Sequence, residues 1–276
     1  MARRHPTPVL VLLAALALGA CDGAGTASDT HGARVEHFEL SSHAVGRKLR
    51  ETLVIPAGAA DRPRPLLVFL HGRGGDEDAE LDETMFAALH RLGARAPVIV
   101  FPNGGEGSYW HDRKGGAWAR YVLDEVVPEA LRRSKADARR LAVGGISMGG
   151  FGAYDLARRN PGRFCAVGGH SPALWVQGGE TAPGAFDDAQ DFVRHDVIGA
   201  VRSSPGTFGS ARVWLDAGAD DPFDPGDRAF LAALSAGGVP VTVHRFPGGH
   251  THDYWASHWR DYLPFYGAAL DACGRG

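Results

Sequence analysis

The stretch Arg140-Leu-Ala-Val-Gly-Gly-Ile-Ser-Met-Gly-Gly-Phe-Gly-Ala-Tyr154 predicts a strand, a tight turn and a helix in direct succession. Its apolar run from Leu141 to Val143 has the length of a buried strand. The run leads into Gly145-Ile-Ser147-Met-Gly149, which matches the pattern G-x-S-x-G. Apolar residues at helical spacing follow, namely Phe151, Tyr154 and Leu156. We therefore interpret Ser147 as a nucleophile on a strained turn at the carboxyl end of a strand.

The two glycines of this pattern have a steric role. Gly145 and Gly149 lack the Cβ atoms that would clash in such a turn. The helix N-terminus behind Ser147 favours negative charge that develops during a reaction. A glycine-rich turn with an incidental serine is the alternative, and partner residues elsewhere in the chain decide between the two.

Length and composition are those of one globular α/β domain. The chain has 276 residues, of which 44% are hydrophobic and 22% are charged, so it has ample material for one core. The 29 basic residues nearly balance the 32 acidic residues, and no cluster of Lys and Arg recurs on a predicted face. We therefore expect no nucleic-acid partner.

Residues 1–20 have the features of a signal peptide. Arg3 and Arg4 precede an apolar run from Val9 to Leu18, which is far too short to span a bilayer. The chain is therefore expected to leave the cytoplasm.

The end of this segment, Leu18-Gly-Ala-Cys21, resembles a bacterial lipobox. We predict that Cys21 is lipidated and becomes the new N-terminus, and that residues 21–34 form a flexible tether. Residues 35–273 would then be the catalytic domain, anchored through lipid alone to the outer face of the cell membrane. Secretion after ordinary signal cleavage is the alternative.

Two further cysteines lie in the domain. Cys165 stands in an apolar strand context and Cys273 in the last predicted helix. Outside the cell the two could pair, but their separation in sequence does not decide it. We expect Cys165 to be a buried thiol.

Strands alternate with helices along the domain, which predicts a doubly wound, mostly parallel sheet in an α/β fold. An antiparallel pair with its turn near Gly46 is expected at one edge, and Pro128 is expected to kink the second helix. The irregular segment 171–210, with helical pieces near 187–192 and 197–201, is expected to pack over the carboxyl edge of the sheet. We predict strands at 35–40, 47–55, 66–70, 98–101, 141–143, 166–169, 213–215 and 241–246, and helices at 81–92, 121–133, 227–236 and 255–270.

A serine nucleophile needs a base to take its proton and an acid to orient the base. The loop after strand 213–215 offers the candidate acids Asp216, Asp220 and Asp221, with Asp224 and Asp227 beyond. Asp216 closes the strand itself, and we expect it to support the loop. The residues alone leave the acid open.

The candidate bases follow the last strand. His250 and His252 lie in its loop, and His258 lies inside the final helix, where we expect a surface or packing role. His244, within the strand, is expected to be structural. The order Ser, Asp, His, with each group in a loop after a strand, fits a hydrolase on a parallel sheet.

The chain resembles the esterase-D / putative esterase family of α/β-hydrolases, which includes S-formylglutathione hydrolases, feruloyl and acetylxylan esterases and mycolyltransferases. The resemblance covers about residues 35–270 and implies an α/β-hydrolase fold. It rests on Leu66-Leu-Val-Phe-Leu-His-Gly72, Ser108-Tyr-Trp-His-Asp112, Gly145-Ile-Ser-Met-Gly-Gly150, Asp216-Ala-Gly-Ala-Asp-Asp-Pro-Phe223 and Gly249-His-Thr-His-Asp-Tyr-Trp255.

The resemblance implies which acid and base act. The family's acid is the second of an Asp-Asp pair in the frame D-x-G-x-x-D-x-F, which selects Asp221 and leaves Asp220 as the alternative. Its base is followed five residues on by an aromatic residue that opens the last helix. Trp255 therefore selects His250 over His252.

The oxyanion hole needs two backbone donors. The Met148 amide, directly after the nucleophile, is expected to be one. The resemblance places the other at the Arg73 amide, in the loop after His71-Gly72, whose glycines let backbone approach substrate. The cleft is expected to include His71 and Gly72, with further lining, or plain packing, by Tyr109, Trp110, Asp112 and Trp175.

A metal site is an alternative interpretation, because His250-Thr-His252-Asp253 places three residues of metal-ligating types within four positions. The zinc-hydrolase pattern H-x-H-x-D-H fails, since Tyr254 and Trp255 occupy its last two positions. We therefore expect neither a metal nor another cofactor.

We therefore predict a serine carboxylesterase that acts through an acyl-enzyme. Its expected extracytoplasmic placement favours polysaccharide-linked, feruloyl, acetyl or envelope-lipid esters over S-formylglutathione. Two alternatives remain, an acyltransferase of the mycolyltransferase type and a catalytically silent ligand-binding lipoprotein. The sequence does not decide the natural substrate or the oligomeric state.

Overall fold

The computed structural model describes residues 29–58 and 63–273. The predicted signal peptide, the lipidation of Cys21 and most of the tether therefore lie outside the described residues. Within these two ranges, no helix combines the length and the apolar character that a bilayer crossing requires.

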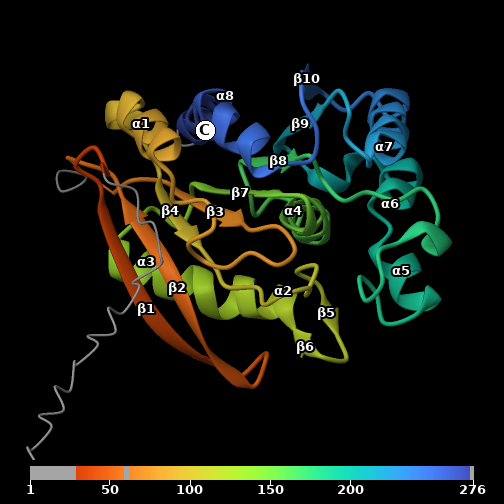
Figure 1. The fold of residues 1–276 in the computed structure, drawn as a ribbon, viewed down its shortest axis with the longest axis horizontal. Helices are drawn as coiled ribbons and strands as arrows, with labels where there is room; N and C mark the ends of the chain where they lie inside the picture. Colours follow the sequence, from red (N-terminus) through yellow and green to blue (C-terminus); the bar gives the residue numbers. More distant parts are fainter. Residues whose placement is uncertain (1–28, 59–62, 274–276) are drawn as a thin grey trace, which may run out of the picture.

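An eight-stranded sheet forms the centre of the described chain, in the order β1-β2-β4-β3-β7-β8-β9-β10 (Figure 1). The β1–β2 hairpin forms one edge and β10 the other. β1 and β2 pair antiparallel, β2 is antiparallel to β4, and all later neighbours are parallel. The strands of this sheet are β1 (Arg34–Ser42), β2 (Arg47–Ile55), β3 (Leu66–Leu70), β4 (Val98–Phe101), β7 (Leu141–Ile146), β8 (Ala166–His170), β9 (Arg212–Gly218) and β10 (Val241–Phe246). The mostly parallel α/β fold predicted from the sequence is confirmed.

Helices cover both faces of this sheet (Figure 1). Two very short strands, β5 (Asp112–Arg113) and β6 (Gly116–Ala117), form a separate hairpin. The helical segments are α1 (Glu83–Arg91), η2 (Gly93–Arg95), α2 (Trp118–Arg120), η3 (Tyr121–Val126), α3 (Val127–Ser134), α4 (Met148–Arg159), η4 (Gly178–Glu180), α5 (Ala189–His195), α6 (Val197–Ser203), η5 (Pro205–Phe208), α7 (Asp224–Ala236) and α8 (His252–Cys273).

The alternation of side chains along β3 explains why both faces are covered. Every residue of β3 is buried. Leu66, Val68 and Leu70 contribute to the core beneath α3, α4 and α7, whereas Leu67 and Phe69 contribute to the core beneath α1 and α8. A strand that is buried on both faces has a continuous apolar sequence rather than an alternating one. The run Leu66–Leu70 has this pattern, and it predicted the strand.

The helix predicted at 121–133 is longer and less regular than expected. It runs from Trp118 to Ser134, with a π-helical turn at Tyr121–Val126. Pro128 lacks a backbone N–H and its ring would clash with the carbonyl four residues earlier. The widened turn directly before it accommodates the proline within one continuous helix.

Helix boundaries depend on capping residues that the apolar pattern does not reveal. α1 begins at Glu83 rather than at 81, because the Asp82 side chain accepts a hydrogen bond from the Met85 amide at 2.7 Å. α8 begins before residue 255 and extends past 270 to Cys273. Its greater length has a consequence for the cysteines.

Cys165 and Cys273 form a disulfide, with their Cα atoms 5.8 Å apart. The expectation of a buried thiol at Cys165 was therefore wrong. Cys165 directly precedes β8, and the last turn of α8 reaches it because that helix continues beyond the last strongly apolar residues. Sequence separation could not supply this proximity.

Candidate active site

Ser147 stands at the turn between β7 and α4, with φ 52° and ψ −113°. A positive φ is rare for a residue with a side chain and marks backbone strain at a functional site. The turn is possible because two glycines flank it. A Cβ on Gly149 would lie 1.9 Å from the Leu70 carbonyl oxygen, and one on Gly145 would lie 2.5 Å from the Gly149 backbone.

Three loops bring the nucleophile, an imidazole and a carboxylate together at the carboxyl edge of the sheet. His250, between β10 and α8, places Nε2 2.8 Å from the Ser147 hydroxyl oxygen. Its Nδ1 lies 3.0 Å from Oδ2 of Asp221, in the loop after β9. Both distances are those of hydrogen bonds. The arrangement can transfer a proton from the hydroxyl to the imidazole.

The Asp221 carboxylate is buried yet stays ionised. Burial opposes ionisation, but hydrogen bonds from His250 and from the Phe223 amide, the latter at 2.9 Å, outweigh it and hold the pKa of Asp221 below its usual range. Asp220, the alternative acid, is exposed, and its backbone amide donates to the Gly248 carbonyl at 2.9 Å. The structure therefore brings Asp221, and not Asp220, to His250.

The acid loop and the base loop are fastened to each other. The Ala219 amide donates to the Phe246 carbonyl at 2.8 Å, beside the bond from Asp220 to Gly248. The His250 ring packs edge-on against Trp255, with ring centroids 4.9 Å apart. His252 also borders the cleft, but it is exposed and starts α8. Its neighbour His250 contacts Ser147.

The predicted oxyanion loop lies against the nucleophile. A Cβ on Gly72 would be 3.6 Å from the Cβ of Ser147, so the two backbones adjoin. The Met148 amide is at the first position of α4, where a helix supplies no internal acceptor. Neither the Met148 amide nor the Arg73 amide donates a hydrogen bond within the described part of the chain. Both are thus available to a ligand oxygen.

His71 and Trp110 lie behind this loop and do not border the cleft. The His71 ring is buried, with Nδ1 2.7 Å from the Gly72 carbonyl and Nε2 accepting from the Gly104 amide at 2.9 Å. The Trp110 indole donates to the His71 carbonyl at 3.2 Å. Both side chains therefore fix the backbone of the oxyanion loop, and their expected place in the cleft lining is corrected.

The cleft above Ser147 has a volume of about 440 Å³. Of the predicted lining residues, Gly72, Arg73 and Tyr109 border it. Asp112 pairs with Arg120 instead, and Trp175 packs against Tyr109 and Phe223 while facing a neighbouring hollow. The residues that border the cleft are Gly72, Arg73, Gly75, Ala79, Glu80, Tyr109, Ile146, Ser147, Ala182, Phe223, His250, His252 and Trp255.

Sequence reasoning missed Glu80 and Ala182 as lining residues. Glu80 follows the oxyanion loop within a run of acidic residues, Asp76-Glu-Asp-Ala-Glu80, which reads as a solvated surface. Ala182 comes from the irregular segment before α5. No local sequence pattern distinguishes either residue. The sequence did predict that segment 171–210 packs over this edge of the sheet, and this is the one indication that a residue such as Ala182 could line the cleft.

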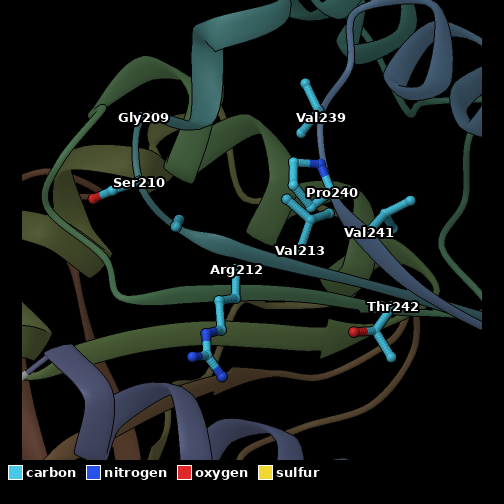
Figure 2. A pocket seen from close by; sticks show the side chains of 9 residues that line it. Gly209, Ser210, Arg212, Val213, Val239, Pro240, Val241 and Thr242 are labelled. Carbon is cyan, nitrogen blue, oxygen red and sulfur yellow. The ribbon is translucent and has the colours of Figure 1, made fainter.

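A second hollow lies at the opposite end of the last two strands (Figure 2). It is lined by the beginnings of β9 and β10 and by the segments before them, including Val213, Val239, Pro240 and Val241. Its volume of about 490 Å³ is similar to that of the cleft. It contains neither a strained serine nor a histidine, so its chemistry is not that of a nucleophilic site.

One group of described residues has the composition of a metal site, His111, Asp191 and His195, all buried. Each of them already has protein partners. His111 Nε2 lies 3.1 Å from Asp191, His195 Nδ1 lies 2.7 Å from Asp155, and the Arg194 guanidinium donates to Asp191 at 3.0 Å. We interpret the group as a buried ion-pair network that fastens α5 to α4 and to the loop carrying Tyr109.

Asp216 has a structural role, as expected, but it lies in the core and holds more than the loop that follows it. Its buried carboxylate accepts hydrogen bonds from His170 at 2.7 Å and from the Trp214 indole at 2.7 Å. It also accepts from the hydroxyls of Tyr254 at 2.7 Å and Tyr262 at 3.0 Å. One carboxylate thereby joins β8, β9 and α8 beneath the site.

Several known proteins are similar to this chain in sequence. An esterase of Mycobacterium tuberculosis strain H37Rv is 28% identical over 255 residues, covering 79% of this chain and 56% of that protein. The present chain thus spans little more than half of that relative's length. The diacylglycerol acyltransferase/mycolyltransferase Ag85A of Mycobacterium leprae is 26% identical over 280 residues, covering 84% of this chain and 82% of the other.

Solved structures share the fold. A ferulic acid esterase superposes with a TM-score of 0.77 at 23% sequence identity, covering 86% of this chain and 99% of that one. A model of the family described as "Putative esterase" matches residues 42–266, which is most of the chain. The chain therefore belongs to this esterase family of α/β-hydrolases.

Proposed function

We propose that the protein is a serine carboxylesterase in which Ser147, His250 and Asp221 form the catalytic triad. The observation that carries the proposal is the continuous hydrogen-bonded chain from the Ser147 hydroxyl through His250 to Asp221. Backbone strain at a serine costs free energy, and it is found mainly at functional sites. Here the strained serine also has a histidine and a carboxylate aligned behind it, as in a catalytic triad. Membership of the esterase family supports the same chemistry.

The proposed reaction proceeds through an acyl-enzyme. His250 Nε2 takes the proton of the Ser147 hydroxyl as the oxygen attacks the ester carbonyl. The carbonyl oxygen becomes an oxyanion that accepts hydrogen bonds from the Met148 and Arg73 amides. His250 then gives its proton to the leaving alcohol, and the C–O bond of the ester breaks. A water molecule attacks the acyl-enzyme by the same steps, which releases the acid and restores Ser147.

The surroundings of Asp221 favour this use of His250. Because the carboxylate stays ionised, it accepts Nδ1–H from His250 and leaves the Nε2 lone pair directed at Ser147. The same negative charge stabilises the imidazolium that forms after proton transfer. No metal or cofactor is required for any step.

The direct test is Ser147→Ala with p-nitrophenyl acetate as substrate. We expect hydrolysis to fall to the background rate, and parent-like turnover by this variant would disprove the nucleophile assignment. Comparison of His250→Ala with His252→Ala tests the base, because both imidazoles border the cleft but only one contacts Ser147. The larger loss of kcat is expected for His250→Ala.

We also propose that the natural substrates are extracytoplasmic esters of modest size, such as acetyl or feruloyl esters of polysaccharides. A cleft of about 440 Å³ accommodates one small acyl or aryl group, and the predicted signal segment, if it acts as one, would put the domain outside the cytoplasm. Rates on a panel of acyl-chain lengths, together with feruloyl and acetylated sugar esters, test the proposal. A preference for S-formylglutathione would contradict it.

Acyl transfer is the second candidate, favoured by the 26% identity to the M. leprae mycolyltransferase. It would use the same acyl-enzyme with an alcohol in place of water. The cleft volume argues against a long-chain acyl donor. Product analysis with a sugar alcohol as acceptor separates the two reactions, since a transferase forms the new ester faster than the free acid.

Lipidation of Cys21 remains a proposal of its own. The lipobox-like Leu18-Gly-Ala-Cys21 supports it. Metabolic labelling with a fatty-acid analogue, compared between the parent and Cys21→Ser, tests it, and label of equal strength in both proteins would disprove it.

A further inference from the structure

Glu80 is an unpaired carboxyl group in the wall of the catalytic cleft. Its side chain is only 4% exposed, and it borders the same cleft as Ser147. Oε2 is buried without a hydrogen-bond partner, and no bond to either carboxyl oxygen is formed within residues 29–58 and 63–273. Burial of an unpaired polar group costs several kcal/mol.

Arg73, the arginine that borders the cleft, forms no ion pair with the carboxyl group. Burial raises the pKa of the Tyr109 phenol, and the Arg73 guanidinium, which interacts with that hydroxyl, partly offsets the rise. Burial, together with the neighbouring Asp82, raises the pKa of Glu80 to about 8. The carboxyl group therefore keeps its proton near neutral pH, and it can both donate and accept a hydrogen bond.

A second unpaired polar group belongs to another residue that borders this cleft. The indole Nε1 of Trp255 is buried without a partner, and Trp255 also borders the cleft. The Glu80 segment and the start of α8 are fastened together, because the Thr84 hydroxyl donates to the Ala256 carbonyl at 2.6 Å. Two residues that border the cleft therefore each carry a buried polar group without a protein partner.

The rest of the cleft is largely apolar. Ala79, Ile146, Ala182 and Phe223 contribute most of the surface that is not backbone or catalytic. An apolar pocket with a few polar groups fixes its ligand by those groups. A hydroxyl is a small substituent that both donates and accepts a hydrogen bond, as the protonated carboxyl group does. An ammonium group only donates and a carboxylate only accepts, so neither uses both functions of this group.

We propose that Glu80 is a specificity-determining residue whose carboxyl group binds a hydroxyl group on the ester substrate. The substrate class is then an ester with an apolar body and a hydroxyl remote from the scissile bond. This inference rests on the proposed esterase function, because it concerns the same cleft.

The test uses two matched pairs of substrates with the full-length protein. Methyl phenylacetate and its para-hydroxyl derivative place the hydroxyl in the acyl part. Phenethyl acetate and its para-hydroxyl derivative place it in the alcohol part. We expect kcat/KM of the parent to favour the hydroxylated member of at least one pair by about tenfold or more. Equal kcat/KM values within both pairs would overturn the proposal.

Glu80→Leu and Glu80→Gln identify the residue responsible. The preference is expected to fall to about one in Glu80→Leu and to return in part in Glu80→Gln, which keeps a donor and an acceptor. Glu77→Gln is the matched control, since Glu77 is a nearby buried carboxylate that pairs with Arg50 and Asn103 outside the cleft. It should keep the preference of the parent. An unchanged preference in Glu80→Leu would refute the inference.

Two further readouts separate this inference from the proposed function. Labelling of Ser147 by a fluorophosphonate reports whether the serine is reactive, whatever the substrate preference, so its absence in the parent would count against the esterase assignment. The melting temperature distinguishes recognition from structure. Glu80→Leu is expected to raise it, because an unpaired buried acid is removed; a large decrease, with the preference retained in Glu80→Gln and Glu80→Leu, would mean that Glu80 is structural.

Discussion

Replacement of Asp221 by Asn tests the acid assignment through a hydrogen bond that fixes which way the new amide faces. The Phe223 backbone N–H donates to Oδ1 of Asp221 at 2.9 Å, while Oδ2 faces His250 Nδ1 at 3.0 Å. In Asp221→Asn the amide oxygen must remain on the Phe223 side, because an NH₂ group there would oppose a donor. The NH₂ group is therefore directed at His250.

This orientation reverses the histidine tautomer. An NH₂ donor requires Nδ1 of His250 to accept, which moves the ring proton to Nε2, the atom 2.8 Å from the Ser147 hydroxyl. A protonated Nε2 cannot act as the base. Loss of the correct tautomer in a triad of this kind lowers kcat by about 10⁴-fold, which corresponds to about 5.5 kcal/mol in the activation barrier. The fold should persist, since the substitution preserves the shape of the side chain.

The assay is kcat for p-nitrophenyl acetate in the parent, in Asp221→Asn and in Asp220→Asn, with the melting temperature of each. Asp220 is exposed and does not contact His250, so Asp220→Asn should retain the parent rate to within about twofold. A larger loss in Asp220→Asn than in Asp221→Asn would refute the reasoning, as would a decrease in Asp221→Asn of less than about tenfold with the fold intact.

Four further outcomes are expected. Gly149→Ala should prevent folding or abolish activity, because its Cβ would meet a β3 carbonyl oxygen at 1.9 Å, whereas Gly115→Ala, with open space around it, should show a near-parent circular dichroism melt. Replacement of both Cys165 and Cys273 by Ser should lower the free energy of unfolding, measured in urea, by about 4 kcal/mol, because the disulfide closes a loop of 108 residues. An unchanged urea midpoint would contradict this. The unfolded chain releases the Glu80 proton near pH 4.5 and the folded chain near pH 8, so the unfolded state binds fewer protons in between. The folding free energy should therefore weaken by at most about 5 kcal/mol over that window and level off above it, and Glu80→Gln should remove this component. Ester hydrolysis should survive exhaustive treatment with a chelator, and loss of activity that zinc restores would argue for a metal-dependent reaction.

The fold and the position of the nucleophile were predictable because they depend on local signals. The run Leu66–Leu70 identified a doubly buried strand, and G-x-S-x-G identified the turn that carries Ser147. The family resemblance selected His250 and Asp221 among competing neighbours, and the structure places both within hydrogen-bond distance of their expected partners. Local pattern alone had left these two positions open.

The parts that the sequence could not supply depend on packing between distant segments. The disulfide forms only because α8 continues to Cys273 and ends beside the strand that follows Cys165. Glu80 lies in an acidic run that resembles a surface loop, yet it is buried and borders a cleft that Ile146, Phe223 and Trp255 also line. Trp110 is of a residue type that often lines clefts, but its indole donates to the His71 carbonyl and so supports the oxyanion loop. In each case the deciding contact joins residues far apart in the chain.

The carboxylate of Asp216 gives the protein a particular mode of thermal failure. Because it holds β8, β9 and α8 through four donors in the interior, the strand leading to Asp221 and the helix that follows His250 cannot fray independently of the core. Regions joined by such shared contacts open as one cooperative unit and exchange their amide hydrogens together. Heat should therefore not produce a folded but inactive species: catalytic competence and the native state should be lost in a single transition.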